Sequence, residues 1–179
     1  MCGLYGFIGQ QPDNKLLNRL ARLACKRGPD GFGYFDGQKI SRFLGKYQEQ
    51  KYTSSIIIGH ARLHTIIGTS KDIEFLQPIV SKNLVFTFNG ALTAHDGRSD
   101  TEYFCRLISK YGVERAAEMC NASTFAVAFY SLKTKRFNLF AKGMDLYVSD
   151  EQSALYWCSK PFAGSKLLTG GITNEKEIY

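Results

Sequence analysis

The second residue of the chain is the first with unusual chemical potential. Cys2 directly follows Met1, so removal of the methionine would give Cys2 both a thiol and a free α-amine. An α-amine has a pKa of about 8 and a thiol one of about 8.5, so this amine could accept the thiol proton. Amino termini do activate side-chain nucleophiles in this way. Free cysteine also packs as a small hydrophobic side chain, so a purely structural Cys2 remains the alternative.

Three further positions carry polar groups at the ends of predicted elements. Arg62 follows the buried strand Ile56–Ile58, where it is either a surface residue or a bidentate anchor for a carboxylate. Asn89 and Gly90 form either a hairpin turn or an oxyanion hole, in which the amide and a backbone N–H donate to developing negative charge. Asp100 either offsets a helix dipole or binds an ammonium group.

The sequence gives little support for a metal site, a phosphate-binding loop, a serine hydrolase or a redox-active cysteine pair. His60 and His64 lie four residues apart on a predicted strand and loop without a nearby acidic partner, so we expect no metal. The sequence has no phosphate-binding glycine loop and no G-x-S-x-G motif. Its five cysteines include no C-x-x-C pair, and Cys25, Cys105 and Cys158 lie among apolar neighbours. We therefore expect no cofactor, and free thiols in a reducing compartment.

Length and composition predict one ordinary globular domain. The chain has 179 residues, so we expect 1–179 to form a single domain with no acceptor domain. No apolar run approaches a membrane span and no secretory signal is visible, which predicts a cytoplasmic protein without membrane contact. The net charge of +7 is scattered, and its one cluster, 133–136, is typical of a hairpin turn. Nucleic acid is therefore not an expected partner.

The pattern of apolar residues predicts the elements that must position these groups. A strand over 2–9 is followed by a helix capped by Asp13 or Asn14, and Ser99 opens another helix with a capping box. The other expected elements are a hairpin over 34–44, strands near 56–58, 84–88, 125–132, 136–141, 146–148 and 154–158, and a helix over 113–120. Strands, then helices, then strands again indicate an α+β layered domain.

Six short blocks, read in order, resemble the class II glutamine amidotransferase domains, which are N-terminal-nucleophile hydrolases. The likeness runs from residue 2 to about 160. The blocks are Cys2-Gly3-Leu4-Tyr5-Gly6, Arg27-Gly28-Pro29-Asp30-Gly31, Gly59-His60-Ala61-Arg62-Leu63, Gln77-Pro78, Asn89-Gly90-Ala91-Leu92 and Ser99-Asp100-Thr101-Glu102. The second block looks most like asparagine synthetases. His64-Thr65 looks closer to the glucosamine-phosphate synthases and phosphoribosyl amidotransferases.

The resemblance implies a fold and a reaction. The fold would be a four-layer αββα sandwich of two antiparallel sheets flanked by helices. Cys2, with its own α-amine as general base, would attack the side-chain amide of glutamine, release ammonia and leave a γ-glutamyl thioester for hydrolysis. Asn89 and Gly90 would stabilise the oxyanion.

The resemblance also implies how the substrate is held. Arg62 would bind the α-carboxylate of glutamine, Asp100 would bind its α-ammonium group, and Thr65 would line the same pocket. At 91–94 and 142–143 this chain differs from the residues that relatives often carry. The resemblance therefore does not predict the surface that faces the nitrogen acceptor.

Three hypotheses follow. The leading one is a glutaminase subunit that supplies ammonia to a separate synthase, because the sequence has no Ser-Gly-Gly-x-Asp-Ser loop and no sugar-phosphate or phosphoribosyl domain. The alternatives are an N-terminal-nucleophile amidohydrolase without a partner and a catalytically silent interaction domain. The nitrogen acceptor and the oligomeric state are not predicted.

Overall fold

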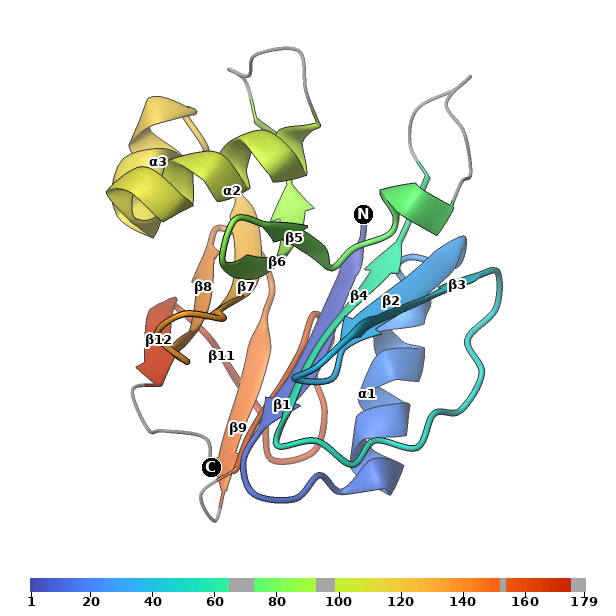
Figure 1. Cartoon of the computed structure of the whole chain (residues 1–179). Helices are drawn as coiled ribbons and strands as arrows, with labels where there is room; N and C mark the ends of the chain where they lie inside the picture. Colours follow the sequence, from blue (N-terminus) through green and yellow to red (C-terminus); the bar gives the residue numbers. More distant parts are fainter. Residues whose placement is uncertain (65–72, 93–98, 152–153, 175–179) are drawn as a thin grey trace.

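A computed structural model describes residues 1–64, 73–92, 99–151 and 154–174. Within them the chain forms two antiparallel sheets that face each other, with α1 on the outside of one and α2 and α3 on the outside of the other (Figure 1). The first sheet has the order β11-β9-β10-β1-β4-β2-β3, and the second β12-β8-β7-β6-β5. This is the αββα layering that the sequence resemblance implied.

The strands of the first sheet are β1 (Gly3–Ile8), β2 (Gly31–Phe35), β3 (Ile40–Leu44), β4 (Ile56–Arg62), β9 (Tyr147–Glu151), β10 (Ala154–Cys158) and β11 (Lys166–Leu167). Those of the second are β5 (Ile79–Ser81), β6 (Leu84–Gly90), β7 (Phe125–Ser131), β8 (Phe137–Lys142) and β12 (Gly170–Asn174). The helices are α1 (Asn14–Cys25), α2 (Asp100–Tyr111), α3 (Val113–Met119) and the short 3-10 helix η1 (Ile73–Phe75). Among the described residues, no helix has the length and apolar character needed to cross a membrane.

Three hydrophobic clusters fill the three spaces between the four layers. Side chains alternate across each strand, so Leu4 of β1 packs between the sheets while Tyr5 packs toward α1. The cluster under α2 and α3 is largely aromatic, with Phe104 of α2 against Phe88 and Phe125 at centroid distances of 5.3 and 5.2 Å. Every sheet face that meets another layer is therefore apolar along most of its length.

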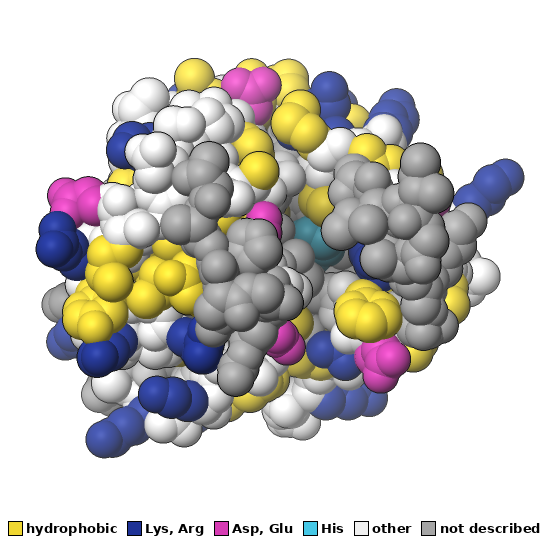
Figure 2. All heavy atoms as spheres, turned by 90° about the horizontal axis from the view of Figure 1, so that it is seen from above, with side chains coloured by type: hydrophobic (Ala, Val, Ile, Leu, Met, Phe, Trp, Pro, Cys, Tyr) yellow, Lys and Arg dark blue, Asp and Glu magenta, His cyan; other side chains and the backbone are white. Residues whose placement is uncertain are grey.

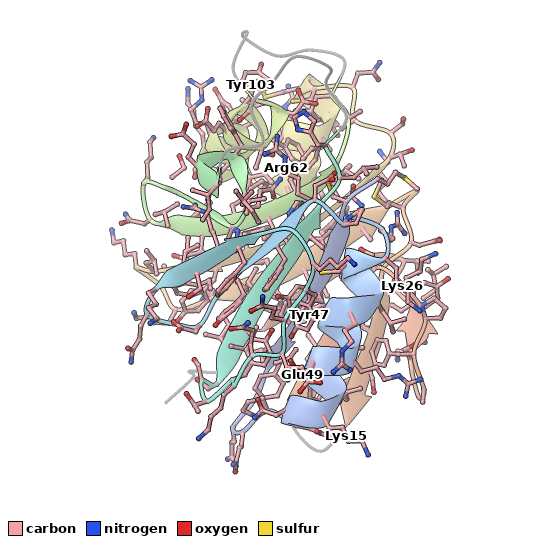
Figure 3. The ribbon with its side chains drawn as sticks, turned by 90° about the vertical axis from the view of Figure 1, so that its right-hand side faces the viewer. Lys15, Lys26, Tyr47, Glu49, Arg62 and Tyr103 are labelled. Carbon is pink, nitrogen blue, oxygen red and sulfur yellow. The ribbon has the colours of Figure 1, made fainter. Side chains whose placement is uncertain are left out.

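The two long helices begin at the caps that the sequence predicts. The Asp13 carboxylate accepts hydrogen bonds from the backbone N–H groups of Lys15 and Leu16, at 2.8 and 3.1 Å. The Ser99 hydroxyl accepts from the Glu102 N–H at 3.3 Å. The segment that carries Tyr47 and Glu49 lies beside α1 (Figure 3), with Tyr47 packed against the cluster between α1 and the first sheet. These caps fix where each helix starts relative to its sheet.

Most of the expected strands are confirmed, with one informative correction. The strand expected to end at Phe88 continues to Gly90, because Asn89 and Gly90 pair with Ala126 and Phe125 of β7. The alternative of a hairpin turn at Asn-Gly is therefore wrong. The structure also contains β5, β11 and β12, which the sequence pattern did not predict. All five cysteines are free thiols.

Candidate active site

Strand alternation brings Cys2 and Arg62 to the same end of the space between the sheets. Leu4 of β1 and Ile58 of β4 both belong to the inter-sheet core. Cys2 lies two residues before Leu4, and His60 and Arg62 continue the face of Ile58, so all three are directed toward that space. The register pairs Leu4 with His60, which sets Cys2 beside Arg62 at the sheet end.

The second sheet supplies the facing wall. Val85 of β6 belongs to the inter-sheet core, and Asn89 lies on the same face four residues later. The Asn89 Nδ2 donates a hydrogen bond of 2.9 Å to the Cys2 carbonyl oxygen, which joins the two sheets at this point. Asp100 lies beside this wall in the first turn of α2, where its Oδ2 accepts from the Leu92 N–H at 3.2 Å.

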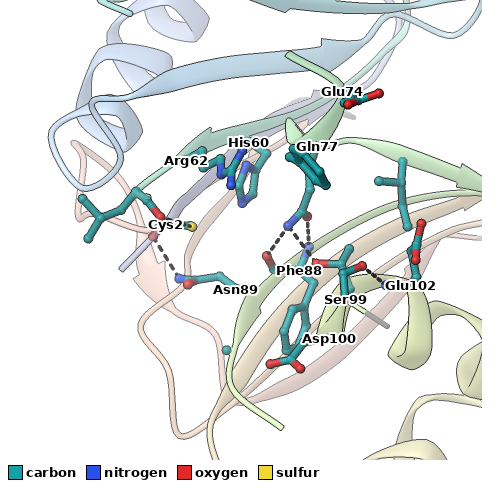
Figure 4. A pocket seen from close by; sticks show the side chains of 15 residues that line it. Cys2, His60, Arg62, Glu74, Gln77, Phe88, Asn89, Ser99, Asp100 and Glu102 are labelled. Atoms are coloured by element: carbon teal, nitrogen blue, oxygen red, sulfur yellow. Dashed lines mark hydrogen bonds between the residues drawn. The ribbon is translucent and has the colours of Figure 1, made fainter. Parts of the chain in front are cut away.

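These elements enclose a cavity of about 360 Å³. Figure 4 shows side chains from both sheets and from the start of α2 converging on it, and Figure 2 shows acidic, basic and histidine side chains on this face of the molecule. The lining residues are Cys2, His60, Arg62, Leu63, Glu74, Phe75, Gln77, Ile79, Phe88, Asn89, Gly90, Ser99, Asp100, Thr101 and Glu102.

The environment of Cys2 favours the protonated form of its thiol. Burial raises the pKa of Cys2 above its ordinary value, and the smaller opposing effects include the positive charges of the amino terminus, Arg62 and Arg27. The Sγ lies 3.9 Å from the Leu63 carbonyl oxygen. A nucleophilic role would therefore need a base close to the thiol.

The segment Arg27–Gly31 holds the end of β4. The Asp30 carboxylate accepts from the His64 N–H at 2.7 Å, and the Asp30 N–H donates to the Arg62 carbonyl oxygen at 3.0 Å. The Arg62 guanidinium lies over the Phe75 ring, 5.7 Å from its centroid. Backbone and side chain of Arg62 are thus both positioned by neighbouring segments.

Gln77 links three elements around the cavity. Its Oε1 accepts from the Phe88 N–H at 2.6 Å, and its Nε2 donates to the Phe88 carbonyl oxygen at 3.2 Å and to the Thr101 hydroxyl at 3.0 Å. These bonds tie the segment before β5 to β6 and to the first turn of α2. The block Gln77-Pro78 was visible in the sequence, but its positioning role was not predicted.

The cavity brings together the predicted residues that the structure describes. Cys2, Arg62, Asn89, Gly90 and Asp100 all line it. Thr65 lies outside the described residues, and the chemical roles of the other five remain predictions. Sequence reasoning missed the lining residues Glu74 and Phe75, which belong to no motif, and it interpreted Glu102 only as part of the block at 99–102.

Comparisons with known proteins give one clear result. No protein-family model matches the chain, and no curated protein matches it significantly. Among solved structures, the chain is similar to glutamine phosphoribosylpyrophosphate (PRPP) amidotransferase from B. subtilis complexed with ADP and GMP, with a TM-score of 0.69 and 19% identity over 97% of this chain and 49% of that chain.

A second similar structure is that of the allosteric regulatory enzyme of purine biosynthesis. Its TM-score is 0.72, with 19% identity, and the match covers 96% of this chain and 46% of that chain. The chain therefore spans about half the length of either protein. At this level of identity the likeness establishes the fold, and it confirms the α+β fold class expected from the sequence. The chain thus shares with the matched halves of these two proteins an α+β fold of two antiparallel sheets flanked by helices.

Proposed function

We propose that this protein hydrolyses the side-chain amide of glutamine with Cys2 as the nucleophile. The observation that carries the proposal is the convergence of a thiol, a carboxamide donor, a guanidinium and a carboxylate on one cavity. They come from the residue before β1 and from β6, β4 and α2, and packing alone would not require any of them there. The shared fold supports the same reading.

The charges at the cavity suit the two ends of an amino acid. Arg62 offers a planar fork for the α-carboxylate, and Asp100 offers a carboxylate for the α-ammonium group. The volume of about 360 Å³ lies at the small end of the range of about 300–1,000 Å³ that is usual for ligand pockets. A substrate of the size of glutamine fits this volume better than a large cofactor does.

The proposed reaction needs Cys2 to be the first residue. Met1 is 65% exposed, so a methionine aminopeptidase can reach it. Once Met1 is removed, the Cys2 α-amine takes the thiol proton as Sγ attacks the carboxamide carbon. The tetrahedral intermediate then expels ammonia, which receives that proton, and a γ-glutamyl thioester remains. Water attacks the thioester, with the α-amine again as base, to give glutamate and the free thiol.

Asn89 and Gly90 would stabilise the oxyanion in both steps. An Asn side chain carries two N–H donors on one nitrogen, and one of them is bonded to the Cys2 carbonyl oxygen in this structure. We assign the second N–H and the Gly90 backbone N–H to the oxyanion. Thr65 is proposed to line the same pocket.

We further propose that the released ammonia passes to a separate synthase. The similar B. subtilis structure is that of an amidotransferase, and this chain matches about half of its length, which supports the proposal. The second candidate is an amidohydrolase that acts without a partner, which the same cavity would serve equally well.

Glutamate release from glutamine tests the proposal. The protein with Met1 removed, confirmed by intact mass, should release glutamate, while Cys2→Ala and a form with one residue inserted before Cys2 should not. Cys25→Ala is the matched control, because Cys25 is a partly buried free thiol that does not line the cavity. If the processed protein releases no glutamate, alone or with candidate synthases, the proposal is wrong. Activity that rises only with a synthase favours the subunit model.

A further inference from the structure

His60 forms part of the cavity wall just beneath Cys2 and Arg62. It lies in the middle of the first sheet, with Leu4 of β1 and Gly33 of β2 as its register partners, and only 1% of its surface is exposed. It shares the face of Arg62, two residues away, and it is diagonal to Cys2 on the neighbouring strand. Figure 4 shows its ring beside Arg62 and directed into the pocket.

The ring of His60 is buried without a hydrogen-bond partner. By distance and angle, neither Nδ1 nor Nε2 makes a hydrogen bond with any described residue, although the backbone of Phe88 lies close enough to interact weakly with the ring. Burial, together with the smaller effect of the Arg62 charge, lowers the pKa of His60 to about 3, and the Phe88 backbone opposes these effects only in part. The ring is therefore neutral, with one N–H donor and one acceptor lone pair.

An unpaired ring at this place is costly for the folded protein. Buried polar groups are nearly always hydrogen-bonded, and one that is not destabilises the fold. An apolar residue would continue the alternation of Ile56 and Ile58 without that cost. The unpaired ring of His60 lies in the wall of the cavity that contains Cys2, so a ligand bound in that cavity can supply the missing hydrogen-bond partner.

We propose that His60 is a substrate-binding residue whose ring hydrogen-bonds the carboxamide group of the bound substrate. This inference rests on the proposed function. Arg62 and Asp100 are assigned to the α-groups, and Cys2 marks the position of the carboxamide carbon. The carboxamide has both a donor and an acceptor, so either ring nitrogen of a neutral imidazole can pair with it.

The proposal predicts opposite effects on stability and on binding. His60→Leu, which is similar in volume and has no polar atoms, should leave the melting temperature unchanged or raise it. The same change should lower kcat/KM for glutamine by about tenfold, the usual worth of one neutral hydrogen bond at its upper range. A merely structural histidine would lose stability and activity together.

Binding to the Cys2→Ala protein locates the contact on the substrate. L-Glutamine and L-norvaline share their α-groups, but only glutamine has the carboxamide. His60→Leu in this background should weaken glutamine binding by about tenfold and leave norvaline binding unchanged. His60→Asn and His60→Gln, which place an amide near the positions of Nδ1 and Nε2, should show which nitrogen makes the bond by restoring affinity. Thr87→Val is the control, since Thr87 is buried in β6 but does not line the cavity.

The ring of the unsubstituted protein provides a further test, in which a variant serves only to assign the signals. The sequence contains three histidines, so the ¹⁵N signals of His60 can be assigned with His60→Gln. Addition of L-glutamine, but not of L-norvaline, should shift them. Equal loss of both ligands in His60→Leu, unchanged glutamine binding, or ring signals that ignore bound glutamine would each overturn the inference. A wild-type protein that neither binds nor hydrolyses glutamine would instead refute the proposed function itself.

Discussion

Asn89 gives the sharpest prediction because its two expected roles differ greatly in size. The residue is 5% exposed in β6, and its Nδ2 donates to the Cys2 carbonyl oxygen at 2.9 Å. Asn89→Ala removes both this bond and the second N–H, which we assign to the oxyanion. Asn89→Asp keeps the size of the side chain but replaces the donor with an acceptor that faces the Cys2 carbonyl oxygen.

The structure allows both effects to be estimated. The bond to Cys2 is a single neutral hydrogen bond, worth about 0.5–1.5 kcal/mol of stability. For a domain of this length each 1 kcal/mol lowers the melting temperature by about 2–4 °C, so this loss corresponds to about 1–6 °C. An oxyanion donor is worth about 10²–10³ in kcat, or about 3–4 kcal/mol. Asn89→Ala should therefore lower kcat far more than its small loss of stability can explain, and Asn89→Asp should lose at least as much activity.

The assay compares kcat and KM for glutamine with the melting temperature of each variant. Thr87→Val is the matched control, because Thr87 is also buried on β6 and its hydroxyl donates to the Ala128 carbonyl oxygen at 3.1 Å, away from the cavity. This variant should lose similar stability and keep its kcat. If Asn89→Ala retains kcat within about threefold, or if kcat falls in proportion to stability in both variants, the assignment of Asn89 to the oxyanion is refuted.

Three more predictions follow from the same structure. Arg62→Ala and Asp100→Asn should each raise KM for glutamine by about tenfold or more with a smaller effect on kcat, measured by glutamate release; unchanged KM would rule out their proposed roles. Gly28→Ala should weaken both glutamine binding and the fold, because the new Cβ would lie 2.6 Å from the Arg62 carbonyl carbon. We expect a lower melting temperature and a higher KM for glutamine. A variant with the wild-type melting temperature and KM would contradict this close packing. Burial raises the pKa of Cys105 to about 12 and that of Cys158 to about 11. In the unfolded chain the same thiols lose their protons at about pH 8.5, so the folded protein holds more protons above that pH. The free energy of unfolding should therefore fall between about pH 8.5 and 12. Urea titrations at pH 8 and pH 10 measure this fall, which should be smaller in Cys105→Ala; a stability that is constant or rising would refute it.

Local sequence signals were sufficient for elements whose boundaries depend on nearby residues. Asp13 caps α1 and Ser99 caps α2 as predicted, because a capping hydrogen bond spans only two or three residues. The cluster at 133–136 forms the turn between β7 and β8, as expected from its composition. The inter-sheet core also follows the expected alternation, since strand side chains have a fixed period of two.

The Asn-Gly pair shows where local reasoning failed. Asn89-Gly90 is among the strongest hairpin signals in a sequence. In the structure both residues continue β6, because β7 extends far enough to pair with them. Pairing with a strand that begins at Phe125, 35 residues later, cannot be seen in a short window. That pairing also directs Asn89 between the sheets, where it meets Cys2.

Some residues of the cavity could be proposed from the sequence, and others could be recognised only in the structure. Cys2, Arg62 and Asp100 could be proposed from the sequence because each has a chemical type that is unusual for its local position. His60 could not, because four-residue spacing from His64 suggested only a metal pair, and its unpaired burial exists only once β1, β2 and β4 are assembled.

The sequence by itself therefore supplied the groups on which the proposed chemistry depends: a thiol that can acquire its own amine base, and charged groups suited to an amino acid. The tertiary structure alone decided that these groups meet. Cys2 and Asn89 are joined by one hydrogen bond across the two sheets, although 87 residues separate them in the chain. The physical reason is that strand alternation fixes the face of each side chain locally, whereas only the packing of one sheet on the other fixes which faces meet.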